Sequence, residues 1–317
     1  MIDSSYLYQG LCGLARAHQA SPMAGHLGAS LIAGYFFAQE HPRLDPAVYA
    51  GVARDLDRVV AGEESLWFDP DAAGITVPEM FAPFSPEPPD AKRVASIATA
   101  LSANIDHTRE AGHNTIFASL ALRAFTEHPE CAEPALVDGI RKLIERFDRA
   151  TPGPGYYGTR RGWVDGAAVT LPDDDGRSSY ANETGMISAV IEELLRDTSI
   201  RRQGFGGVFH LINHAQGLLD LSRLGYRELA NRGLAAHEHH LHLYRSLPDV
   251  AGELGALVKS NEDPLTPEHW SRTESVQWSA WLTHRIKTLY AFRGLLRTID
   301  DSETQRRAED AFRYLMA

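Results

Sequence analysis

Two nineteen-residue segments of this chain repeat the same helix signals, and they constrain the fold more than any other feature. The first is AGHLGASLIAGYFFAQEHP, residues 24–42, and the second is AGHNTIFASLALRAFTEHP, residues 111–129. Each segment opens with Gly-His, continues as an apolar run and closes with His-Pro. Because apolar runs of this length between such signals are typical of buried helices, the repeat predicts helices that each begin with a histidine.

Helical periodicity divides the rest of the chain into about four units of three helices. The helices expected in the first unit cover residues 6–20, 27–37 and 46–60, and those in the second cover 94–105, 114–125 and 134–147. The third unit has helices at 182–196 and 227–244 with a helix carrying His210 between them. The fourth has helices at 254–259 and 302–316 with a helix carrying His284 between them. Asp45 before Pro46 is a helix start, and Ser179 or Asn182 can cap a later one. We therefore predict an all-α fold, a toroid or irregular bundle of about twelve helices in a single domain, residues 1–317.

Three stretches rich in Pro, Gly or Asp separate the units, at residues 65–89, 151–178 and 246–274. They are expected to be irregular, with a short hairpin around residues 156–170. Long irregular loops in compact proteins more often serve function than connection. The second stretch follows Gly153-Pro154-Gly155 with aromatic residues, an arrangement that suits a pocket lid.

Composition excludes several classes of protein. The net charge of −11 argues against a nucleic-acid binder, which needs a basic face to neutralise phosphates. The sequence contains no run of 18 or more apolar residues, which is the length that would predict a membrane span. Residues 1–10 lack the pattern of a signal peptide. The two cysteines, Cys12 and Cys131, are too few for a disulfide framework, and both are expected to be buried free thiols. The expected compartment is therefore the cytoplasm.

Histidines at matching helix positions form the candidate functional centre. They are His26, His113, His210 and His284. Equivalent residues of a repeat lie at equivalent points, so four imidazoles are expected to converge as metal ligands. His214, one turn after His210, is a further ligand or substrate contact, and Asp220 is expected to accept a hydrogen bond near the metal rather than bind it, with a catalytic role. Nitrogen ligands without a thiolate suit Fe(II), Mn(II), Cu(II) or Zn(II).

Other polar and aromatic residues are given weaker roles. Of the four histidines in AAHEHHLHLYR, one, His240, is a candidate for the site, and most of the others are expected to be solvated: His237, His239 and His242. Lys287 is interpreted as a surface lysine, with a local base or the partner of a carboxylate as the alternatives. The acidic run Asp173–Asp175 is interpreted as a solvated turn. The aromatic residues that either wall a pocket or pack in the core are Trp67, Phe68, Trp278 and Trp281.

Two segments resemble the questin oxidase-like family. One is GVFHLINHAQGLLDL, with His210, His214 and Asp220, and the other is THRIKTLYAF, where His284 precedes Thr288 by four residues. GHNTIFASLALRAF, which opens at Gly112, is similar more loosely, and together the match covers about a third of the chain. Two departures are the absence of a Gly-Tyr run after His214 and an Asp at position 220 where the family has Glu.

The resemblance implies a helical oxygenase that uses a histidine-rich, non-haem iron centre and O₂ to oxidise polycyclic aromatic ketones such as anthraquinones. The chain is accordingly expected to be an Fe(II)-dependent enzyme with a small-molecule substrate. Two alternatives stay open. One is a metal-free helical toroid acting on sugars or terpenoids through paired carboxylates, Glu183 with Asp165 or Asp175. The other is a non-catalytic helical scaffold that holds a lipid or a partner.

Overall fold

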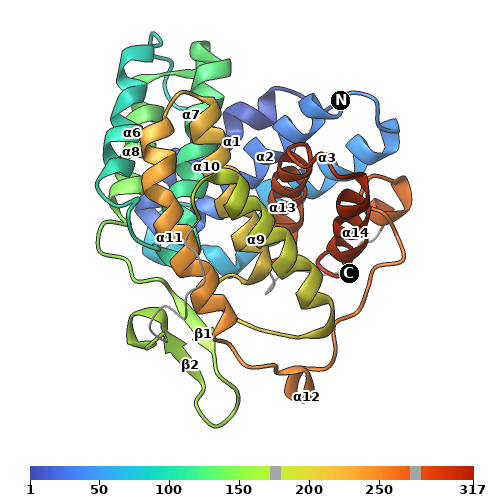
Figure 1. Ribbon diagram of the computed structural model, residues 1–317. Helices are drawn as coiled ribbons and strands as arrows, with labels where there is room; N and C mark the ends of the chain where they lie inside the picture. Colours follow the sequence, from blue (N-terminus) through green and yellow to red (C-terminus); the bar gives the residue numbers. More distant parts are fainter. Residues whose placement is uncertain (172–179, 272–279) are drawn as a thin grey trace. The chain divides into compact units, whose positions relative to one another are not determined.

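The computed structural model describes residues 1–171, 180–271 and 280–317, and within them it confirms an all-α fold (Figure 1). These residues contain fourteen α-helices and a two-stranded sheet. They form two compact units. The first comprises Met1–Leu101, Phe117–Phe147 and Glu262–Ala291, and the second comprises Ser102–Ile116, Asp148–Asn261 and Phe292–Ala317. The expectation of a single domain stays a prediction.

The first unit is built on long helices packed along one another. They are α1 (Ser5–Ala20), α2 (Gly25–Glu40), α3 (Pro46–Val60) and α8 (Pro134–Glu145), with α6 (Ala95–Ser102) and most of α7 (His113–Glu127) and α13 (Trp281–Leu296). α1 packs against α2 and α8 (Figure 1). The α1–α2 approach depends on glycine, because a Cβ at Gly28 would lie 2.5 Å from the carbonyl oxygen of Gly10.

Helix starts in this unit follow the sequence signals. Asp45 caps α3, because its Oδ1 accepts a hydrogen bond from the amide of Ala47 at 2.8 Å, and Pro46 occupies the first turn.

The stretch at residues 65–89 is less irregular than expected. It contains a 3₁₀ turn at Ser65–Trp67 and the one-turn helices α4 (Pro70–Ala73) and α5 (Val77–Met80). Asp69 and Thr76 cap these two helices, and the Thr76 cap pairs with Glu79 in a capping box.

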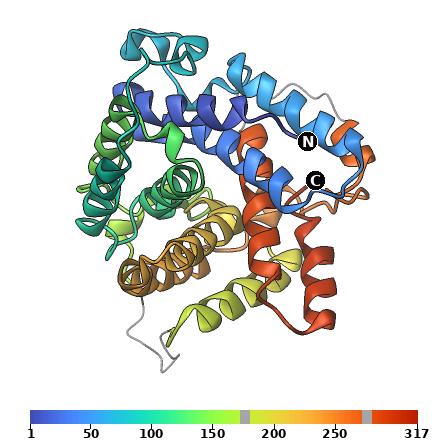
Figure 2. The same cartoon turned by 90° about the horizontal axis from the view of Figure 1, so that it is seen from above.

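The second unit is formed by α9 (Glu183–Arg196), α10 (Gly207–Arg223), α11 (Arg227–Arg245) and α14 (Ser302–Phe312), with the one-turn α12 (Ala251–Leu254). α10 packs against α11 and α9, and α9 packs in turn against α14, in the yellow to red part of Figure 2. The expected hairpin is present as β1 (Pro154–Tyr156) paired antiparallel with β2 (Trp163–Asp165).

Several expectations can be compared with this unit directly. Asn182 caps α9, since its Oδ1 accepts from the amide of Gly185 at 3.0 Å. The helix expected at residues 254–259 is wrong. α12 ends at Leu254 because Gly255 turns the chain with a φ of 81°. Ser179, Asp173–Asp175 and Trp278 lie outside the described residues.

Two remaining expectations concern the thiols and the membrane. Cys12 is buried, Cys131 is half-buried, and burial raises the pKa of each thiol to about 11. Both are free thiols, but the expectation that Cys131 is fully buried is wrong, because it ends a surface 3₁₀ turn at Pro129–Cys131. Over the described ranges, no helix has both the length and the apolar character needed to cross a bilayer.

Candidate metal centre

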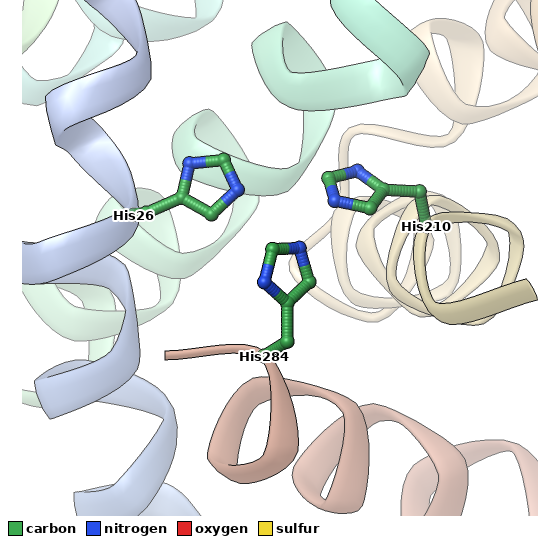
Figure 3. Close-up of side chains that lie close together, drawn as sticks. All are labelled: His26, His210 and His284. Atoms are coloured by element: carbon green, nitrogen blue, oxygen red, sulfur yellow. The ribbon is translucent and has the colours of Figure 1, made fainter. Parts of the chain in front are cut away.

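In the first unit, the rings of His26 and His284 lie against one another in the core. His26 stands on the first turn of α2 and His284 on the first turn of α13 (Figure 3). Their centroids are 4.9 Å apart and their planes are tilted by 50°. His26 Nδ1 lies 2.9 Å from the carbonyl oxygen of Met23, and His284 Nδ1 lies 2.7 Å from that of Ala280. A carbonyl only accepts, so Nδ1 of each ring is the donor in these hydrogen bonds.

An aromatic and acidic support fixes this pair. The Trp67 ring stacks on His26 at 3.9 Å with an interplanar angle of 10°. Its indole N–H donates to Glu64 Oε1 at 2.8 Å. The same buried carboxylate accepts from the amide of Thr283 at 3.2 Å and from its hydroxyl. Glu64 therefore ties the ring that covers His26 to the start of the helix that carries His284.

The surroundings of His284 keep its imidazole neutral. Burial, together with the nearby Lys287, lowers its pKa to about 3. Lys287 lies one turn along α13 and is 1% exposed, so its interpretation as a surface lysine is wrong. The physical reason is that α13 is buried on all sides, since every residue from Leu282 to Phe292 is buried. A neutral imidazole is the form that binds metal ions.

In the second unit, His113 and His210 form a second pair. Their ring centroids are 4.4 Å apart, tilted by 58°, and the side chains are 3% and 2% exposed. His113 begins α7, and its Nδ1 is hydrogen-bonded to the carbonyl oxygen of Glu110. His210 lies in the first turn of α10. The four repeated histidines thus lie as two close pairs, one inside each unit.

The backbone ahead of both helices in this unit is left-handed. Glu110, Ala111 and Gly112 have φ values of 43°, 54° and 85°, and Phe205 and Gly206 have values of 48° and 69°. Such conformations are costly for residues other than glycine and tend to persist at functional sites. Both segments are therefore held in place by contacts from elsewhere in the unit.

Those contacts come from the loop that sequence analysis singled out at residues 151–178. The amide of Glu110 donates to the carbonyl of Thr151 at 2.7 Å, and the amide of Phe205 donates to that of Pro154 at 2.8 Å. Glycine is also needed sterically. A Cβ at Gly206 would lie 2.2 Å from His210 Cγ, and a Cβ at Gly112 would lie 2.5 Å from His214 Cγ. These glycines let the backbone lie directly against the histidine rings.

Three more histidines are packed together behind this pair. The His214 ring lies 5.0 Å from His237 and 5.7 Å from His240. His237 Nε2 donates to the carbonyl of Leu211 at 3.0 Å, and His240 Nε2 donates to that of Phe205 at 2.8 Å. Burial lowers the pKa of His237 to about 4 and that of His240 to about 3, and it lowers the pKa of His214 well below its usual value. All three are neutral core residues near neutral pH.

The expectation that only one histidine of α11 is buried is therefore wrong. His237 and His240 are both fully buried, whereas His239 and His242 are half-buried. The reason is the stripe formed by Leu234, His237, Leu241 and Tyr244, with spacings of three, four and three residues that bring them to one face of the helix. That spacing is visible in the sequence.

Replacing His240 by glutamine is expected to change how stability depends on pH. The unfolded chain binds a proton at His240 as the pH falls below about 6.5, while the folded chain does not until about 3. Wild-type protein therefore loses up to about 1.4 kcal/mol of unfolding free energy per pH unit from this group in that range, and the variant does not. The contribution of neutral His240 to the unfolding free energy is therefore fully present above about pH 6.5 and is lost as the pH falls below that value.

Urea unfolding of both proteins between pH 5 and 7.5 measures this difference. Carboxylates with raised pKa values, such as Asp197 at about 6, act in the opposite direction but are common to both proteins and cancel. The advantage of the wild type over the variant should shrink toward pH 5. An advantage that stays constant with pH would show that His240 is protonated equally in both states.

The remaining candidates have other contacts. Asp220 is the predicted catalytic acidic residue. Its Oδ1 accepts a hydrogen bond from Gln216 Nε2 at 2.7 Å and lies 3.7 Å from Arg223 Nη1. At about 1.5 Å of rise per residue it stands roughly 15 Å along α10 from His210, so we give it no place in a site at that histidine. Asp165 accepts from Thr151 at 2.6 Å and from the amide of Ala167, and Glu183 stands in the first turn of α9. Asp175 lies outside the described residues.

Sequence reasoning did not identify Glu64 as part of the histidine environment. It lies in the polar stretch Gly62-Glu63-Glu64-Ser65, where nothing distinguishes a buried carboxylate from a solvated one.

Comparison of the chain with known proteins adds no assignment. No family model, curated protein or solved structure matches it.

Proposed function

We propose that this chain is a metal-dependent oxygenase in which His26, His210 and His284 bind one divalent ion, Fe(II), and in which O₂ oxidises an aromatic or ketone-type small molecule. The single observation that supports this most is the histidine chemistry. Buried imidazoles are held through their Nδ1 atoms by backbone carbonyls, which makes Nε2 of His26 and of His284 the ring nitrogens that would bind a metal.

In the proposed site each of the three histidines would offer one ring nitrogen to the ion, at the distance of about 2.0–2.2 Å that is usual for nitrogen ligands. Three protein ligands leave positions open on an ion that prefers six, as required for binding O₂ or substrate. Nitrogen donors without thiolate suit iron and exclude a thiolate-bound structural zinc site.

The chain's own residues orient the ligands and keep water out. Trp67 covers one face of the His26 ring, and the Phe117 ring meets His26 edge-on at a centroid distance of 5.7 Å. Glu64 holds Trp67 through its indole N–H. In the second unit His113 lies against His210. When bound, the iron would supply the ability to activate O₂, while these aromatic walls would favour an apolar substrate.

Binding of nitric oxide to the Fe(II)-loaded protein tests this function without knowledge of the substrate. Nitric oxide occupies positions that O₂ would take, and its adduct with Fe(II) gives a spin-3/2 signal in electron paramagnetic resonance. We expect about one such spin per bound iron in the wild type and in His242→Ala, and none in His26→Ala. Iron that binds tightly but gives no nitric oxide signal would contradict an oxygenase while leaving a structural metal.

A further inference from the structure

The second unit contains a cavity of about 520 Å³ that is lined by none of the candidate metal ligands. Its walls come from residues 106–109 ahead of α7, residues 149–152 after α8, the segment that follows β2, and one side of α11. All of these segments belong to the second unit. His107, Arg149 and Ala235 line the cavity and are exposed, so a ligand in solution can reach it.

Two arginines line this cavity, and neither pairs with a carboxylate of the described residues. Arg109 Nη1 donates to the carbonyl oxygen of Ala150 at 2.6 Å, whereas Arg109 Nε is buried and has no hydrogen-bond partner within the described ranges. Arg149 forms no ion pair with any residue that the structure describes. Other arginines of this unit, such as Arg202, are paired with carboxylates. A buried guanidinium N–H without an acceptor beside an open cavity indicates a ligand that supplies one.

The other ionisable groups at the cavity leave this positive charge uncompensated. Among the described residues that line it, Asp106 is the one carboxylate. It is held by Arg232, whose Nε and Nη2 lie 2.9 Å and 2.5 Å from its two oxygens. His107 and His239 also line the cavity, and His239 Nδ1 lies 2.9 Å from Thr108 Oγ1. Imidazole N–H groups add hydrogen-bond donors to those of the arginines, so the cavity favours an anion.

We propose that this cavity binds the phosphate group of a small phosphomonoester whose organic part lies on the apolar wall. Such a phosphate carries a charge of about −1.5 to −2 at pH 7, which the two guanidinium groups of Arg109 and Arg149 can neutralise. Guanidinium groups bind phosphate oxygens through their fixed fork of N–H donors. Pro152, Val169 and Ala236 provide the apolar wall. This ligand site goes beyond the oxygenase function and does not depend on it.

Isothermal titration calorimetry on the full-length chain, in metal-free buffer at pH 7 and low ionic strength, tests the proposal with phenyl phosphate as the probe. We expect one binding site per chain. Inorganic phosphate should bind at least about tenfold more weakly, because it cannot bury an apolar ring. Absence of phenyl phosphate binding up to about 10 mM, or equal affinity for the two phosphates, would overturn the proposal.

Two variants and a matched control locate the site. Arg149→Ala removes a guanidinium from the cavity, and Ala235→Glu adds a like charge to its wall from an exposed position on α11. Each should weaken phenyl phosphate binding at least about tenfold. Arg160→Ala removes an exposed arginine of the same unit that does not line the cavity, and it should bind as the wild type does.

Equal affinities in Arg149→Ala and Arg160→Ala would show that the phosphate binds elsewhere and would overturn the assignment. None of these substitutions alters a candidate metal ligand, and no metal is present in the titration. Failure of phosphate binding would therefore leave the proposed oxygenase function untouched, and failure of iron binding would leave this site untouched.

Discussion

Replacing His284 by alanine is expected to weaken Fe(II) binding by at least about 100-fold. Loss of a residue that only hydrogen-bonds to a metal ligand typically costs about 10–100-fold in metal affinity, and this substitution removes a ligand itself. His284 is also the ring packed on His26, at a centroid distance of 4.9 Å, so both nitrogen donors of the first unit are disturbed. Anaerobic titration with Fe(II), followed by equilibrium dialysis, measures the change.

The matched control is His242→Ala, which removes a half-buried histidine from the outer part of α11. It should bind Fe(II) as the wild type does. Unfolding must be measured beside binding, because removal of a buried ring also costs roughly 1–3 kcal/mol whether or not a metal is bound. A His284→Ala protein that folds and binds iron normally would exclude His284 as a ligand.

Replacing Asp55 by alanine is expected to lower the free energy of unfolding by about 3–5 kcal/mol, as is typical when one partner of a buried ion pair is removed. Asp55 Oδ2 lies 2.5 Å from Arg285 Nη2, and the two side chains are 0% and 2% exposed. The Arg285 guanidinium also stacks 4.4 Å from the Trp270 ring, which keeps it in the core. The substitution therefore removes the carboxylate that pairs with a guanidinium held in the core.

Two variants isolate the cause. The exposed pair Glu303–Arg306 has a similar separation of 2.7 Å, and Glu303→Ala should change the unfolding free energy by less than about 1 kcal/mol. The double variant Asp55→Leu with Arg285→Met should recover much of the loss, because it replaces both charges with apolar groups. Equal effects of Asp55→Ala and Glu303→Ala in urea unfolding would contradict a structural role for the buried pair.

The helices were predictable because their signals are local. The AGH and HP borders mark the repeated helices, and Asp45 and Asn182 mark helix starts through a single capping bond. The error at residues 254–259 has a local cause too, since the positive φ at Gly255 was not recognised as a stop. Local patterns determine where a helix begins and ends, but they do not determine which other segments pack against it.

The candidate site was less predictable because it depends on burial between segments distant in the chain. Repeat position predicted that all four histidines converge on one centre, which stays a prediction, whereas the structure shows two pairs, His26 with His284 and His113 with His210. Nothing local shows that Glu64 is engaged by Thr283, a residue 219 positions later. Lys287 was assigned to the surface because a lysine usually is, and only the packing on every side of α13 shows otherwise.

The metal content of untagged wild-type protein tests the central claim most directly. The chain is purified without chelator, loaded anaerobically with Fe(II), desalted, and analysed for metal and protein concentration. A site formed by His26, His210 and His284 predicts one iron per folded chain, reduced to near zero in His210→Ala. A folded, helical wild-type protein that retains no metal would contradict it.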